Sequence, residues 1–143
     1  MRLSKILTFI VMTALIIILV LGCSTKSQYE KEFLRIYGEY LYNTGELFET
    51  VDYYKENPSN APEYFNDDWV LEAYYMFMAD MIGELDKLEV PDEYKDFHTY
   101  FLLSYIYEYN CKDAEGKLCD EYRQKSQELL DTAYSYNHPT TKE

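Results

Sequence analysis

Apolar and polar positions follow the period of α-helices over most of the chain. From residue 28 onward, apolar side chains recur every three or four positions, which is the spacing of one helix face. Four segments carry this pattern: Gln28 to Lys55, a stretch from near Asn66 or Asp67 that stops before Pro91, a third from Pro91 to about Asn110, and a fourth after the loop Lys112–Lys117. The pattern predicts an all-α domain.

The breaks between these segments are short and rich in turn-forming residues. Glu56–Pro62 holds two prolines and two asparagines, Asn66 or Asp67 can cap the second helix, and Pro91 ends one helix and opens the next. Short connections predict an antiparallel, up-down-up-down bundle of three to four helices over residues 29–137, followed by a flexible tail, 138–143. A three-helix core with a loosely attached first helix is the alternative.

An uncharged apolar run near the N-terminus has a different character. Ile6–Leu21 follows the positive residues Arg2 and Lys5, which is the layout of a secretory signal. Its 16 residues are slightly fewer than a membrane-spanning helix usually needs. An uncleaved N-terminal anchor is one alternative. A cleaved signal without lipid is another, although no small-x-small cleavage site precedes the polar region.

The run closes with Val20-Leu21-Gly22-Cys23: an aliphatic, a variable and a small residue, then a cysteine. This tetrapeptide resembles the lipobox of bacterial lipoproteins. The resemblance implies that residues 1–22 are a cleaved lipoprotein signal peptide and that Cys23 carries diacylglycerol through a thioether. Residues 23–28 are then a short lipidated tether. The domain is expected at the cell membrane, facing the extracytoplasmic side, because two acyl chains anchor a protein stably.

The chain that follows residue 22 is strongly acidic. It holds all 26 Asp and Glu but only 11 of the 13 Lys and Arg, which leaves a formal charge of −15. Nucleic acid is a poor partner for such a chain, because its binding depends on Lys and Arg that neutralise phosphates. Anionic lipid head groups should also repel the domain. The charge favours a basic partner or cations.

Two further cysteines lie eight positions apart. Outside the cytoplasm, the pair Cys111 and Cys119 is interpreted first as a disulfide, here a staple across the turn of a helical hairpin. A zinc site is disfavoured because no Cys-x-x-Cys or nearby histidine completes it.

The sequence offers little for catalysis, so we predict a non-enzymatic protein without a cofactor or a metal. Only His98 and His138 supply an imidazole, and the Gly-x-Ser-x-Gly pattern of serine hydrolases is missing. His98 is predicted to be structural. Asp80 interrupts an apolar stretch, and its spacing places it on a polar helix face with Glu84 and Lys87.

Tyrosine is the strongest compositional signal, with 17 residues. Tyr105, Tyr107 and Tyr109 cannot all face one side of a helix, so some of them are expected to be exposed and to bind a partner. The alternative is that tyrosine replaces leucine at half-buried positions, since its ring is apolar and its hydroxyl can stay wet.

The segment Leu85–Leu102 contains Leu-x-x-Leu, then Val90-Pro91, then a helix that bears His98. It resembles the helix-proline-helix hairpin of small helical lipoproteins of Gram-positive bacteria. Some similar lipoproteins belong to phages and act in superinfection exclusion. No catalytic residues come with the resemblance. It implies an interaction module for a membrane or cell-wall protein; a small-ligand or glycan-binding lipoprotein is the alternative.

Overall fold

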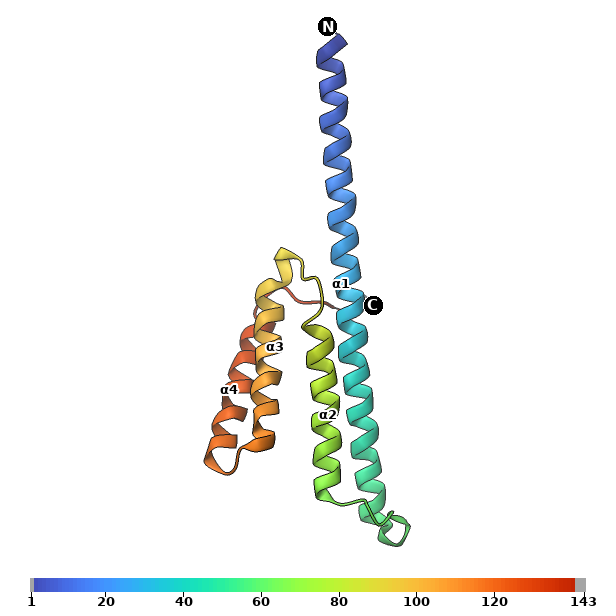
Figure 1. The fold of residues 1–143 in the computed structure, drawn as a ribbon, viewed down its shortest axis with the longest axis vertical. Coiled ribbons are helices and arrows are strands. Elements are labelled where there is room, and N and C mark those ends of the chain that lie inside the picture. The colour runs from blue at the N-terminus through green and yellow to red at the C-terminus, as the bar shows by residue number, and fades with distance from the viewer. Residues whose placement is uncertain (1, 141–143) are drawn as a thin grey trace.

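The computed structural model describes the backbone of residues 2–140 and the side chains of residues 25–140. Within those residues the regular structure is helical throughout, as predicted. The elements are α1 (Arg2–Glu56), η1 (Pro58–Asn60), α2 (Asp67–Leu85), η2 (Asp92–Tyr94), α3 (Lys95–Tyr109), η3 (Asn110–Asp113) and α4 (Lys117–Tyr134). Successive helices run in opposite directions, so the predicted up-down-up-down order is confirmed (Figure 1).

The helix boundaries have local causes that the sequence already contains. The side chain of Asn66 accepts a hydrogen bond of 2.8 Å from the backbone N–H of Trp69, which makes Asn66 the cap of α2. Pro91 has extended backbone and precedes a short 3-10 turn rather than opening α3 directly. Gly116 precedes α4 with φ 55°, a left-handed conformation that glycine adopts without strain.

Aromatic rings fill the centre of the bundle. α1 pairs with α2, α3 pairs with α4, and α1 meets α3 through large side chains. The Phe33 ring lies 5.2 Å from Phe97 and 5.0 Å from Phe101, both in edge-on geometry. Phe97 and Phe101 also contact Tyr134 of α4. Such pairs add to the stability that their burial provides.

The first helix is an integral part of this core. Tyr29, Phe33, Ile36, Tyr40 and Leu47 of α1 are all buried. The alternative of a three-helix core with a loosely attached first helix is therefore wrong, because the α1 side chains supply one wall of the core.

Both ends of the domain make contacts with its body. The backbone of the predicted tether, residues 23–28, is helical and continuous with the rest of α1. Lys26 also forms an ion pair of 3.2 Å with Glu93 and lies over the ring of Tyr94. The predicted flexible tail starts with two packed residues, because Pro139 is buried and the His138 ring contacts Phe97.

The other predictions about the two ends concern residues or side chains that the structure does not describe. The side chains of the predicted signal peptide, 1–22, and that of Cys23 lie outside the described residues, as do residues 141–143 of the tail. Among residues 25–140, whose side chains the structure describes, no helix combines the length and apolarity that crossing a membrane requires.

Candidate binding groove

A groove of about 700 Å³ opens at the end of the molecule that lies far from Lys26. We call it the distal groove. Its apolar wall comes from α1, the start of α2 and the loop between them: Phe48, Val51, Phe65, Val70, Leu71 and Tyr74. The facing side is narrower and polar, with Glu108 at the end of α3 and Arg123 on α4.

The unequal reach of the two helix pairs leaves this wall open. Figure 1 shows that the α1–α2 pair extends further along the long axis than the α3–α4 pair. α3 has 15 residues and α2 has 19, so the last turns of α1 and the first turns of α2 lack a full neighbouring helix. Phe48 therefore stays 50% exposed and Leu71 48% exposed.

Aromatic packing fixes the loop that closes this end. The Phe65 ring lies 4.6 Å from Tyr54 and 5.5 Å from Trp69, so the loop after η1 is held against both helices. Tyr64 and Trp69 form another pair at 5.9 Å, and both remain partly exposed. The groove wall therefore belongs to an ordered corner of the domain.

Charged side chains line the rim of the distal groove, and the neighbouring sequence is acidic. Residues 46–72 contain eight Asp and Glu but only one basic residue, Lys55. Asp52 and Asp67 lie on the groove itself, and Lys55 lies 4.0 Å from Asp52. Opposite them, Arg123 lies 3.7 Å from Glu108. The distal groove thus combines an apolar wall with a charged rim of three carboxylates and two basic side chains, next to a strongly acidic segment of the chain.

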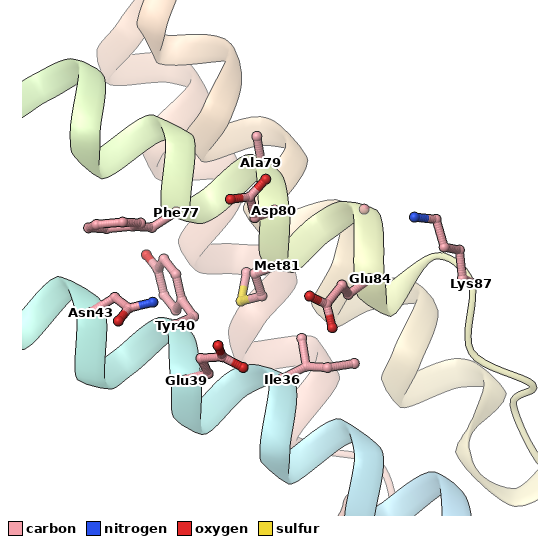
Figure 2. A pocket seen from close by; sticks show the side chains of 11 residues that line it. Ile36, Glu39, Tyr40, Asn43, Phe77, Ala79, Asp80, Met81, Glu84 and Lys87 are labelled. Atoms are coloured by element: carbon pink, nitrogen blue, oxygen red, sulfur yellow. The ribbon is translucent and has the colours of Figure 1, made fainter.

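A second pocket, of about 360 Å³, lies between α1 and α2 nearer the middle of the bundle. Figure 2 shows Glu39 and Tyr40 of α1 facing Asp80, Met81 and Glu84 of α2. Asp80 is exposed and shares this pocket with Glu84 and Lys87, which confirms its predicted place on the polar face.

One guanidinium connects the carboxylates beside this second pocket. Arg35 bonds Glu84 at 2.8 Å, Glu39 at 3.1 Å and Glu32 at 3.0 Å. These bonds raise the pKa of Arg35, the bond to Glu84 having the largest effect. Arg35 already pairs with the carboxylates of Glu39 and Glu84. We therefore interpret this pocket as part of the packing interface between α1 and α2, not as a binding site.

His98 is a buried structural residue, as predicted. Its Nδ1 lies 3.1 Å from the hydroxyl of Tyr29, and burial lowers the pKa of the imidazole. Among the residues that the structure describes, no group of three or more His, Cys, Asp or Glu side chains is placed to hold a metal ion.

The structure joins the predicted cysteine pair. Cys111 and Cys119 form a disulfide with their Cα atoms 4.7 Å apart, across the turn between α3 and α4. The predicted staple is therefore confirmed in its pairing and in its place on a helical hairpin.

The three tyrosines predicted to bind a partner all lie between helices. Tyr105 donates a hydrogen bond of 3.1 Å to the Tyr37 hydroxyl, and its surroundings raise its pKa chiefly through burial. The rings of Tyr107 and Tyr109 contact Tyr122 and Tyr75 at 6.0 and 5.8 Å. All three are half-buried, so they do not form an exposed patch.

Exposed aromatic residues lie elsewhere, and four of them gather at the distal groove and the corner beside it. Phe48, Tyr53, Tyr64 and Trp69 are each more than a third exposed. Sequence reasoning missed this cluster. The sequence did contain a signal for this cluster. Aromatic residues lie on both sides of the turn-rich segment Glu56–Pro62, and a loop there can bring them together.

The chain matches no protein-family model, no curated protein sequence and no solved structure. Two features of the protein itself bear on its function: the distal groove and the sequence around Cys23.

Proposed function

We propose that this chain is a lipid-anchored, non-enzymatic binding module that captures a protein partner in the distal groove, on the extracytoplasmic side of the cell membrane. The observation that carries the proposal is the open apolar wall around Phe48 and Leu71, each about half exposed. Exposed apolar patches with a polar rim are typical of protein interaction sites.

The anchor in this proposal is diacylglycerol on Cys23, on the strength of the sequence Val20-Leu21-Gly22-Cys23. In this proposal the ion pair of Lys26 with Glu93 ties the first residues after the lipid attachment point to the rest of the domain. α1 then runs from Tyr29 to Lys55 without a break, about 40 Å at 1.5 Å per residue. In this arrangement the distal groove stands away from the lipid surface, within reach of other membrane or cell-wall proteins.

Two contacts support the non-enzymatic part of the proposal. His98 bonds Tyr29 inside the core, and Cys111 is tied to Cys119. Superinfection exclusion is one specific form of the proposal, in which the captured partner takes part in DNA entry.

A glycan-binding lipoprotein is the second candidate. The specific observation in its favour is the pair Tyr64 and Trp69, which are 63% and 38% exposed. Partly exposed aromatic rings can stack on sugar faces. A cell-wall glycan fragment that raises the melting temperature would support this candidate, because a ligand that binds only the folded state stabilises it.

In-cell photo-crosslinking tests the leading proposal. A photoreactive residue is placed at position 71 in the full-length protein, and a matched one at exposed Leu118 of α4, which does not line the distal groove. We expect one dominant protein captured from position 71 and not from position 118. Replacing Cys23→Ser should move the protein out of the membrane fraction and abolish the capture. Equal capture from both positions, or capture that survives Cys23→Ser, contradicts the proposal.

A further inference from the structure

We propose that the occupant of the distal groove is a cationic amphipathic helix of the partner protein, packed beside α1 and α2 as an additional helix of the bundle. This inference rests on the proposed function and names the chemistry of its partner.

The apolar wall has the length and spacing of a helix-binding surface. Phe48 and Val51 lie three positions apart on α1, and the aliphatic stem of Lys55, four positions further on, extends this row to about 10 Å. Val70 and Tyr74 continue the wall on α2, four positions apart. Two parallel rows of this kind accept the side chains at positions i, i+3 or i+4, and i+7 of a docked amphipathic helix.

The bundle itself indicates where such a helix lies. In the middle of the molecule, α3 covers α1 through Phe97 and Phe101, which pack on Phe33. At the distal groove α3 has ended, and it contributes only Glu108 to the lining. A docked helix continues the role of α3 along the part of the α1–α2 pair that α3 does not reach.

Charge selects the kind of helix. Asp52, Asp67 and Glu108 line the groove against Lys55 and Arg123, and the chain after residue 22 carries a formal charge of −15, so a helix with Lys or Arg on its flanks gains attraction on approach. A second copy of this chain brings the same negative charge to the groove and is repelled. An anionic lipid surface is disfavoured for the same reason.

The test uses the full-length protein in nanodiscs of zwitterionic phosphatidylcholine, with empty nanodiscs as the blank. One probe is an amphipathic helical peptide of about 15 residues, made of Leu and Lys. The other has Glu in place of every Lys and the same apolar face. We expect the Lys peptide to bind and the Glu peptide to bind at least about tenfold more weakly, since like charges oppose approach.

Matched variants separate groove binding from general attraction to an acidic protein. Leu71→Gln removes apolar surface from the groove, whereas Leu118→Gln removes it from an exposed site on α4; they are 48% and 46% exposed in the parent. Neither changes the charge, and circular dichroism confirms that both fold. We expect Leu71→Gln to weaken binding of the Lys peptide about tenfold or more, and Leu118→Gln to leave it unchanged.

Three outcomes overturn the inference: equal effects of the two variants, equal binding of the two peptides, or a dimer of the parent that Leu71→Gln dissociates. The crosslinking experiment distinguishes this failure from a failure of the proposed function. If position 71 captures a protein in cells while the Lys peptide does not bind, the binding module stands and the cationic helix is rejected. If neither is seen, both are rejected.

Discussion

The hydroxyl of Tyr29 lies 3.1 Å from Nδ1 of His98 and links the start of the bundle in α1 to α3, across 69 positions of sequence. His98 is only 8% exposed. Burial is the largest influence on the pKa of its imidazole and lowers it, while the nearby carboxylate of Asp86 acts in the opposite direction.

This lowered pKa predicts a loss of stability in mild acid. Between the folded pKa of His98 and the ordinary value of about 6.5, the unfolded chain binds more protons than the folded one. The contribution of His98 is therefore intact above about pH 6.5 and is lost as the pH falls toward the folded pKa, at about 1.4 kcal/mol per pH unit between the two values. Urea unfolding at pH 7 and pH 5 measures this loss.

The matched variant for that measurement is His98→Gln, which keeps a polar group near Tyr29 but does not titrate. Because the many carboxylates also respond to pH, the informative quantity is the difference between parent and variant. We expect the parent to lose more stability than His98→Gln between pH 7 and pH 5. Parallel losses in the two proteins would show that His98 makes no such contribution.

Removing the Tyr105 ring should destabilise the bundle. Tyr105→Ala is expected to cost about 3–5 kcal/mol, as for other large core side chains. Tyr105→Phe removes only the hydrogen bond to Tyr37 and should cost about 0.5–1.5 kcal/mol. Tyr42→Ala is the control, because Tyr42 is 66% exposed, and its effect should stay within about 0.5 kcal/mol. If Tyr105→Ala matched this control, Tyr105 would not belong to the core.

The disulfide should contribute measurably to stability. The double variant Cys111→Ala, Cys119→Ala opens a loop of separation 8, and we expect the free energy of unfolding to fall by about 2–3 kcal/mol. Denaturation in urea with and without a reductant measures the effect. The reductant should lower the stability of the parent by a similar amount and leave the double variant unaffected. Sensitivity of the double variant to reductant would point to some other cause.

The ion pairs of Arg35 should contribute little to the stability of the fold, and only at low salt. Arg35 is about half exposed, so Arg35→Met is expected to lower the stability only slightly despite its three carboxylate partners. Lys31→Met on the same helix changes the net charge equally and is the control. Any excess loss in Arg35→Met should vanish near about 1 M salt, where screening is strong. An excess that persists there would assign a packing role to the Arg35 side chain.

The helical fold was predictable because its signals are local. The period of apolar residues, the cap at Asn66, the break at Pro91 and the spacing of Cys111 and Cys119 each depend on a few neighbouring positions. The boundaries shifted slightly: α2 ends at Leu85, and α3 begins after the 3-10 turn that follows Pro91.

The placement of the tyrosines depends on contacts between distant segments, so the sequence alone left it open. Tyr107 and Tyr109 point to different neighbours, and both are half-buried because Tyr122 of α4 lies beside one and Tyr75 of α2 beside the other. The distal groove is similarly non-local. It exists because the α1–α2 pair reaches beyond α3 and α4. The hydrophobic pattern within one helix does not predict how far a neighbouring helix extends beside it.

An even number of antiparallel helices returns the chain to the end where it started. Pro139 is buried, and His138 packs on Phe97, the same ring that contacts Phe33 near the start of the bundle. Figure 1 shows the segment that follows α4 running toward α1. A fluorescent reporter or affinity tag attached after Thr140 would therefore sit at the end of the bundle that carries Lys26 and leave the distal groove clear. The same reporter inserted at Pro58–Asn60 would stand next to the groove and obstruct it.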